Sequence, residues 1–213
     1  MSVMKLISAK RKADFTYGSL YLGDARELIK EIPDGYVDLI FTDPDFEDDL
    51  IFDLEPEFWR VLKSDAWLVF YWAIERLPQA DRFKRFEYVW LIISEFKRSR
   101  TMSRLGRRNY MPILVFKKGK PKVHKALGDL LPAFDYPEIE FKCKKPKFFK
   151  PTLLNSTIIA IFTRRGDLIL DPFTGLGSIP YACERGQRRW IAFEIDPETW
   201  RRAASFIGTG VVK

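Results

Sequence analysis

The sequence has little of what several common classes of protein require. Its 213 residues include only two cysteines, Cys143 and Cys183, and one histidine, His124. Two widely separated cysteines do not suggest a disulfide framework, which favours a reducing, cytoplasmic location. A structural zinc site usually needs about four thiol or imidazole ligands, more than this chain can supply, so no metal is expected.

Apolar runs are also short. No run approaches the roughly 18 residues that a membrane-spanning helix needs, so no membrane partner is expected. The opening stretch, MSVMKLISAKRK, lacks the apolar segment and the small-residue cleavage site of a secretory signal. A hydrophobic content of 46% is that of a globular protein, and residues 1–213 suit a single domain.

Acidic charge is scarce in one central segment. Residues 97–150 hold 16 of the 36 Lys and Arg residues but only four of the 29 Asp and Glu residues. The rest of the chain carries 20 basic and 25 acidic side chains, so the net charge of +7 comes from this segment. Basic side chains interrupted by aromatic residues favour a polyanion such as nucleic acid, with a solvated lysine-rich surface as the alternative. The candidate phosphate contacts are Arg100, Arg104, Arg107 and Arg108.

Short apolar runs alternate with helical patterns along the rest of the chain. We expect strands at 19–22, 37–42, 67–72, 88–94, 111–116, 167–170 and 190–195. Helices are expected at 24–32 with Pro33 as the stop, at 54–63, around Pro78, from Pro151 to Gly166, at 178–185 and at 197–206. This alternation predicts a doubly wound α/β fold, with helices on both faces of a mostly parallel sheet. Residues 97–110 are predicted to form a loop and residues 117–149 an irregular insertion.

The stretch DLILDPFTGLGSIPYACERGQRRWIAFEID carries one motif. Its first strand ends at Asp171, a loop contains Gly175 and Gly177, and the next strand ends at Glu194. This layout is typical of nucleotide-type cofactor sites, in which the acid after the second strand accepts both ribose hydroxyls. Pro180 replaces the third glycine of the dinucleotide pattern, which argues against a pyrophosphate and for a cofactor without phosphates. A purely structural turn is the alternative.

A second motif is the acidic loop in LIFTDPDFEDD, at the end of the strand predicted for 37–42. Its acids either perform chemistry or cap and solvate a loop. A different interpretation makes Asp43, Asp45, Glu47, Asp48 and Asp49 oxygen ligands of Mg²⁺ or Mn²⁺, as in a nuclease or nucleotidyl enzyme. That interpretation leaves the glycine motif unexplained.

Together the two motifs resemble a known family. DPFTGLGS followed by FEID resembles the S-adenosylmethionine site of DNA amino-methyltransferases. LGDARELIKEIPDGYVDLIFT leading into DPDF resembles the segment that carries the Asp-Pro-Pro-Tyr motif of that family. The catalytic motif comes first and the cofactor motif last, as in the permuted subgroup called beta. The resemblance covers roughly residues 19–72 and 110–204.

This resemblance implies a Rossmann-like methyltransferase sheet of the seven-stranded type. It also implies transfer of a methyl group from S-adenosylmethionine to the exocyclic amine of a base flipped out of double-stranded DNA. Asp43 and the carbonyl of Pro44 would accept the amino hydrogens, and Phe46 would stack on the base. The implied cofactor contacts are Asp24, Lys150, Asp171, Phe173, Gly175, Gly177 and Glu194. Asp24 could instead be only a helix cap, and Lys150 an ordinary surface residue.

The segment 97–150 would hold the target-recognition loops, which vary within the family. Related enzymes often dimerise, so a homodimer is one expectation. Asp45 replaces the second proline of the motif, which loosens the loop and adds charge near the DNA. The Asp at the start of the motif favours adenine N6 as the target. Cytosine N4 methylation, an inactive DNA-binding homologue and the metal-dependent nuclease stay open as alternatives.

Overall fold

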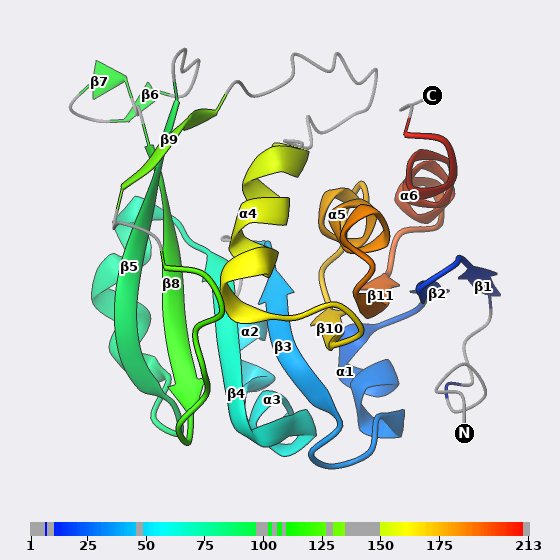
Figure 1. Cartoon of the computed structure of the whole chain (residues 1–213), viewed down its shortest axis with the longest axis horizontal. Helices are drawn as coiled ribbons and strands as arrows, with labels where there is room; N and C mark the ends of the chain where they lie inside the picture. The colour runs from blue at the N-terminus through cyan, green and yellow to red at the C-terminus, as the bar shows by residue number, and fades with distance from the viewer. Residues whose placement is uncertain are drawn as a thin grey trace.

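The computed structural model describes residue 7 and residues 11–45, 49–96, 102–103, 106–107, 110–126, 130–134 and 150–210. A nine-stranded sheet forms the centre of this part of the chain (Figure 1). Its spatial order is β1 (Arg11–Asp14), β2 (Gly18–Leu22), β11 (Arg189–Glu194), β10 (Leu168–Asp171), β3 (Val37–Thr42), β4 (Leu62–Tyr71), β8 (Tyr110–Lys118), β5 (Glu87–Phe96) and β9 (Leu130–Phe134).

The central strands are mostly parallel, as the sequence predicts. β2, β11, β10, β3 and β4 run in the same direction, whereas β8 is antiparallel to both β4 and β5. The seven strands from β2 to β5 make up the expected sheet. β1 extends it at one edge, antiparallel to β2, and β9 extends it at the other, parallel to β5.

Helices cover both faces of the sheet (Figure 1). One face carries α4 (Thr152–Phe162), α5 (Ser178–Gly186) and α6 (Pro197–Thr209). The other carries α1 (Ala25–Leu28), α2 (Leu50–Asp53), α3 (Glu55–Val61) and the 3₁₀ segments η2 (Ile29–Glu31) and η3 (Ile74–Arg82). The doubly wound α/β arrangement is therefore confirmed.

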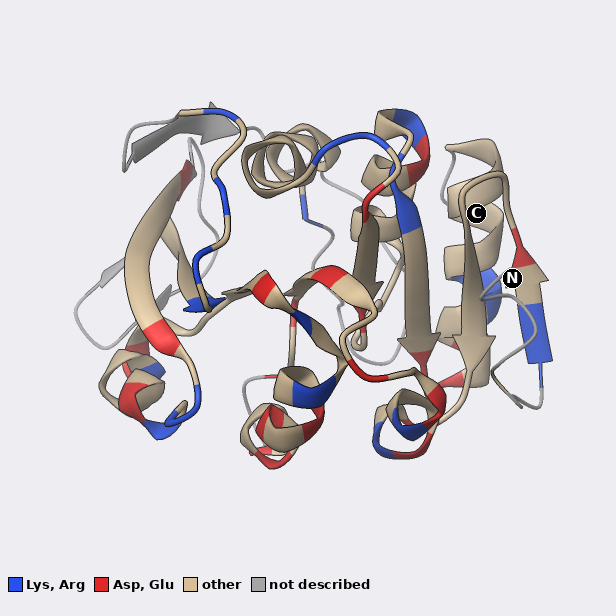
Figure 2. Cartoon of the chain, turned by 60° about the horizontal axis from the view of Figure 1, so that its bottom comes forward, with Lys and Arg blue, Asp and Glu red and all other residues tan. Residues whose placement is uncertain are grey.

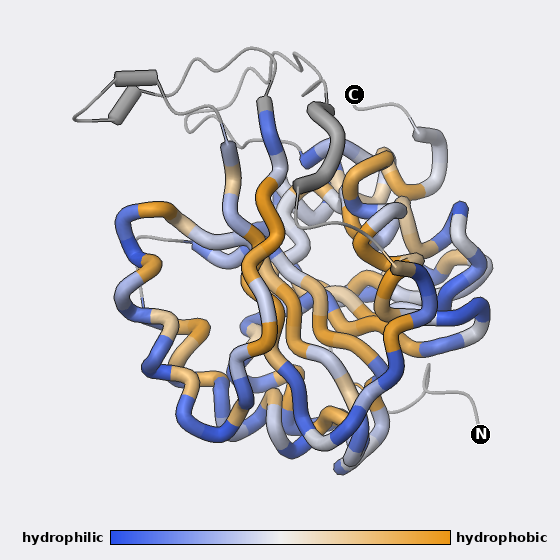
Figure 3. The backbone as a smooth tube through the Cα atoms, turned by 60° about the vertical axis from the view of Figure 1, so that its left-hand side comes forward, coloured by the Kyte–Doolittle hydropathy of each residue, from blue (hydrophilic) through white to orange (hydrophobic). Residues whose placement is uncertain are grey.

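β4 shows why the sheet needs cover on both sides. Its alternate residues Trp67, Val69 and Tyr71 belong to the core under α4 and α5, and Leu68 and Phe70 belong to the core on the opposite face. All five side chains are buried, because successive residues of a strand point to opposite faces and both faces here are covered. Figure 3 shows the hydrophobic residues concentrated along the central strands.

The register brings the two sequence motifs together. In parallel strands the carboxyl ends meet at one edge, so the residues that follow β3, β10 and β11 lie side by side. Leu170 of β10 pairs with Ile40 of β3, which places Asp171 close to Thr42. Glu194 ends β11, the next strand along this edge. α6 begins directly after it, where the side chain of Asp196 accepts a hydrogen bond from the backbone of Thr199.

Several expectations about local structure were wrong. The helix expected over 54–63 ends at Val61, because Leu62 and Lys63 already belong to β4. The loop expected over 97–110 contains a small hairpin, β6 (Met102–Ser103) with β7 (Gly106–Arg107). The insertion expected over 117–149 contains β9, whose partner β5 lies far away in the sequence. β1, with the sequence RKAD, has none of the apolar alternation that predicts a strand.

The helix expected around Pro78 is a 3₁₀ helix, Ile74–Arg82, with the proline inside it. Across the described residues we find no helix that is both long and apolar enough to cross a membrane.

Candidate active site

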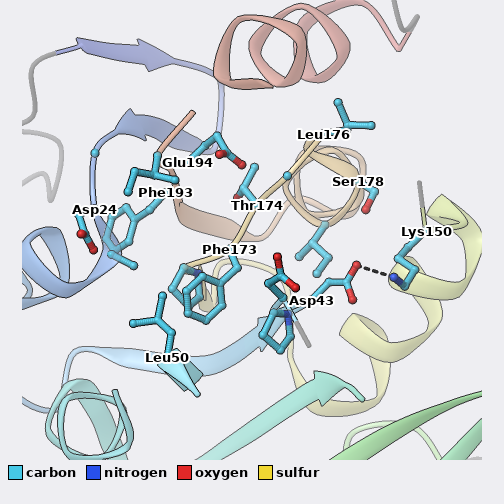
Figure 4. A pocket seen from close by; sticks show the side chains of 18 residues that line it. Asp24, Asp43, Leu50, Lys150, Phe173, Thr174, Leu176, Ser178, Phe193 and Glu194 are labelled. Atoms are coloured by element: carbon cyan, nitrogen blue, oxygen red, sulfur yellow. Dashed lines mark hydrogen bonds and ion pairs between the residues drawn. The ribbon is translucent and has the colours of Figure 1, made fainter. Parts of the chain in front are cut away.

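A cavity of about 430 Å³ opens at the carboxyl edge of the parallel strands (Figure 4). It is lined by residues 23–25 after β2, 43–45 after β3, Leu50, Lys150, 172–176 after β10, 178–179 in α5 and 193–195 at the end of β11. Pockets for small molecules usually enclose about 300–1,000 Å³, so one ligand of that class fits here. The cavity therefore unites the two sequence motifs.

Two acids lie at one end of the cavity (Figure 4). Glu194 is only 8% exposed, and its Oε1 accepts a hydrogen bond of 2.9 Å from the backbone of Asp196. Asp24 caps α1 by accepting from the backbone of Arg26, and it also pairs with the Arg26 guanidinium at 2.5 Å. That hydrogen-bonded pairing lowers the pKa of Asp24. Asp24 is therefore a helix cap that also borders the cavity.

The two glycines of the loop have different surroundings. Gly175 lines the cavity, has a φ of +55°, and a Cβ there would meet no atom within 4 Å. Gly177 has a φ of +85° and does not line the cavity, and a Cβ on it would lie 2.9 Å from Cγ1 of Ile207 in α6. Both positions need a left-handed backbone, which glycine adopts without strain. At Gly175 the backbone lies close to the cavity, and at Gly177 it lies close to helix α6.

Asp171 lies behind the wall of the cavity. It is 2% exposed and accepts hydrogen bonds from the hydroxyls of Thr42 at 2.7 Å and Thr174 at 3.0 Å. Burial raises the pKa of Asp171 to about 7. Its neighbour Phe173 does line the cavity, between the two ends (Figure 4). Asp171 thus fixes the loops around it, and a ligand in the cavity would contact Phe173.

Asp43 and Lys150 lie at the other end of the cavity (Figure 4). Lys150 is only 4% exposed, and its Nζ lies 2.5 Å from Oδ2 of Asp43. The second oxygen of Asp43, Oδ1, is buried and has no hydrogen-bond partner among the described residues. Pro44 is buried and borders the same space. This end of the cavity therefore carries a carboxylate that is held at Oδ2 and has an unsatisfied oxygen at Oδ1.

The other acids of the loop lie apart from Asp43. Asp45 is exposed at the rim of the cavity. Asp49 is exposed and forms ion pairs with Arg76 and Arg82, and these two arginines lower the pKa of Asp49. In the part of the chain that the structure describes, no group of three or more His, Cys, Asp and Glu side chains is placed to hold a metal ion. Phe46, Glu47 and Asp48 lie outside the described residues.

The expected DNA contacts are mostly outside the described residues too. Arg100, Arg104 and Arg108 lie outside the described residues, and of Arg107 only the backbone, in β7, is described. The basic residues that follow β8 lie at the amino edge of the sheet, away from the cavity, since β8 is antiparallel and its Lys118 pairs with Ala66 in the amino-terminal half of β4. In Figure 2 the charges are spread around helices and loops, and the strands carry few.

Several cavity-lining residues, among them Leu50, Thr174 and Ser178, escaped the sequence analysis, and so did three residues that support the site. Thr42 holds Asp171, Tyr71 lies beneath Lys150, and Asn155 bonds Tyr71. The signal for Thr42 was its position, since it is a polar residue at the end of a buried strand. Tyr71 and Asn155 sit within apolar patterns and gave no such signal.

Comparison with known proteins agrees with these observations. The family model N6_N4_Mtase, described as DNA methylase, matches residues 37–205. The type II methyltransferase M.BamHI of Bacillus amyloliquefaciens is 28% identical over 232 residues, which cover 84% of this chain and 54% of that protein. The chain thus spans about half the length of that relative. The putative methylase YubD of Escherichia coli K12 is 26% identical, with 81% and 82% of the two chains covered.

Solved structures show the same fold. The M1.HpyAVI–SAM complex has a TM-score of 0.72 at 24% identity, covering 87% of this chain and 98% of that one. The cytosine-N4-specific PvuII DNA methyltransferase has a TM-score of 0.73 at 20% identity, covering 94% and 90%. At these identities the likeness concerns the fold, and it confirms the methyltransferase-type sheet.

Proposed function

This chain belongs to the DNA methylase family, and on that premise we propose that it methylates the N6 amino group of adenine in double-stranded DNA. S-adenosylmethionine is the methyl donor of the family. The observation that carries the proposal is Asp43, a residue that lines the cavity and whose Oδ1 is a buried acceptor without a partner among the described residues. A buried acceptor of this kind is costly unless a ligand donates to it.

The residues of the cavity fit the cofactor. The carboxylate of Glu194 can accept from two ribose hydroxyls, and the open space beside Gly175 lets the backbone approach the ligand. Phe173 offers an apolar contact between the two ends. When bound, S-adenosylmethionine supplies an activated methyl group. Glu194 would hold the ribose at one end of the cavity, and Asp43 lies at the other end.

Asp43 prepares the target nitrogen. The lone pair of an exocyclic amine is delocalised into the base, so the nitrogen is a poor nucleophile. An acceptor on each amino hydrogen pulls the nitrogen toward a tetrahedral geometry and orients its lone pair. The carboxylate of Asp43 supplies one acceptor, and the carbonyl of Pro44 is the candidate for the second. The base would have to be flipped out of the duplex to reach them.

The choice of adenine rests on the Asp at the start of the motif. Cytosine amino-methylases more often begin this motif with Ser, and this chain has Asp43. The competing product is N4-methylcytosine. Both products follow from the same amine chemistry, so only product analysis separates them.

The test is incubation of unmethylated genomic DNA with labelled S-adenosylmethionine, followed by digestion to nucleosides and mass spectrometry. We expect N6-methyladenine from the wild type and no product from Asp43→Ala. Asp43→Ala should bind the cofactor within about tenfold of the wild type, or ~1.4 kcal/mol. N4-methylcytosine would overturn the choice of base. An active Asp43→Ala, or a wild type that binds the cofactor and methylates nothing, would overturn the proposed reaction.

A further inference from the structure

We infer that Lys150 is a positioning residue for the catalytic carboxylate: by holding Oδ2 of Asp43 it fixes the orientation of that carboxylate toward the target amine. This inference rests on the proposed function. It assigns Lys150 a role different from the cofactor contact that the family resemblance implies. Its starting point is the 2.5 Å contact between Nζ of Lys150 and Oδ2 of Asp43.

The ammonium group of Lys150 has two partners, Asp43 and Tyr71, which come from two different strands. Asp43 follows β3, Tyr71 ends β4, and Lys150 lies two residues before α4. The Nζ atom lies 4.9 Å from the centroid of the Tyr71 ring, so the cation is placed between a carboxylate and an aromatic face. Because the side chain is almost fully buried, its charge depends on these two partners rather than on water.

Tyr71 is itself held in place. Its hydroxyl donates a hydrogen bond of 2.6 Å to Oδ1 of Asn155, a fully buried residue of α4. The backbone N–H of Asn155 in turn donates to the carbonyl of Pro151, the residue after Lys150. The first turn of α4, the end of β4 and the end of β3 are thereby joined around one lysine. Such a support fixes a side chain better than a loop alone does.

A carboxylate held at one oxygen has a defined direction for the other. Terminal torsions of Asp are broad, so an unheld Asp43 would rotate and present neither oxygen reliably. The contact with Lys150 removes that freedom, and the buried Oδ1 is the result. Misplacing a reacting group by about 1 Å can cost roughly 100-fold in rate, so the contact matters for turnover.

The experiment compares Lys150→Met, Lys150→Arg and Tyr71→Phe. Cofactor affinity is measured by calorimetry, and the methyl-transfer rate in a single turnover with saturating cofactor and DNA. Lys150→Met should slow transfer by about 100-fold. Its cofactor affinity should change by less than about threefold, well below the tenfold step of ~1.4 kcal/mol. Lys150→Arg keeps a cationic donor and should recover part of the rate. Tyr71→Phe keeps the ring and should have a smaller effect than Lys150→Met.

Comparison of a double variant with a single variant controls for misfolding caused by a buried unpaired charge. Lys150→Met with Asp43→Asn leaves neither charge buried, and its rate should equal that of Asp43→Asn alone, because Lys150 acts only through Asp43. A double variant much slower than Asp43→Asn would overturn the inference. So would a Lys150→Met variant that binds the cofactor weakly and transfers normally at saturation, since Lys150 would then serve the cofactor. An inactive wild type would instead refute the proposed function.

Discussion

Thr42 donates a hydrogen bond of 2.7 Å from its hydroxyl to Oδ1 of Asp171, a residue 129 positions further along the chain. Thr42 directly precedes the catalytic candidate Asp43, and Asp171 opens the glycine loop of the cofactor site. One buried hydrogen bond therefore links the two motifs. The positions of the acceptor carboxylate and of the cofactor wall are coupled through it.

Removing this bond should cost stability. Thr42→Val keeps the size of the side chain but leaves the buried Asp171 carboxyl without one of its donors. We expect a loss of ~1–3 kcal/mol in the free energy of unfolding, measured by urea denaturation. Thr42→Ser keeps the hydroxyl and is the matched control. Equal stability of the Val and Ser variants would mean that the bond contributes nothing.

The buried Asp171 should make stability depend on pH. Its pKa is about 7 in the folded protein, and an unfolded aspartate has a pKa of about 3.9. Between these values the folded state holds a proton that the unfolded state does not, so the stabilisation is complete below about pH 4 and is lost as pH rises through about 7. The difference between these two pKa values corresponds to at most about 4 kcal/mol in the free energy of unfolding. Asp171→Asn should flatten this part of the curve of unfolding free energy between pH 5 and 8, and an unchanged curve would contradict the assignment.

Glu194 should matter for the cofactor. Glu194→Ala removes the acceptor of two ribose hydroxyls, and we expect S-adenosylmethionine binding to weaken by ~1.5–3 kcal/mol in calorimetry. Glu194→Gln is the control, because it keeps one acceptor oxygen and the hydrogen bond from Asp196. It should lie between the wild type and the Ala variant. Equal affinity of all three proteins would place the ribose elsewhere.

The two glycines should respond differently to substitution by alanine. Gly177→Ala would strain a positive φ and crowd Ile207, so it should destabilise the fold by ~1–3 kcal/mol. Gly175→Ala meets no neighbour and strains only the backbone, by about 1 kcal/mol. Its main effect should be on cofactor affinity, because it adds a methyl group to the cavity wall. Thermal unfolding and calorimetry on both variants separate the two effects.

The salt dependence of DNA binding should distinguish the two parts of the basic segment. Neutralising Arg104, Arg107 and Arg108 together should lower the slope of log affinity against log salt by ~0.9 for each phosphate that the variant no longer binds. Neutralising Lys120, Lys122 and Lys125 is the matched control. These exposed residues follow β8 at the edge away from the cavity, and the slope should change little. A larger effect from the lysines would place the DNA at the opposite edge of the sheet.

Local patterns in the sequence were sufficient for the class of fold and the motifs. The strand expected at 37–42 matches β3, and the helix expected from residue 178 begins where α5 does, because apolar runs, caps and glycines act over a few residues. The resemblance of the acidic and glycine motifs also identified the family that the comparisons show. Of the expected site residues, Asp24, Asp43, Lys150, Phe173, Gly175 and Glu194 line one cavity together with Pro44 and Asp45.

The tertiary structure alone decided which residues touch. Asp43 meets Lys150 across 107 positions, Tyr71 meets Asn155 across 84, and Gly177 faces Ile207 of another helix. β9 belongs to the sheet through its pairing with β5, which is distant in the sequence. Such contacts follow from strand order and register, which arise when distant segments bury their apolar faces together. No local period records them, so the sequence determined the parts of the site and the packed sheet determined their partners.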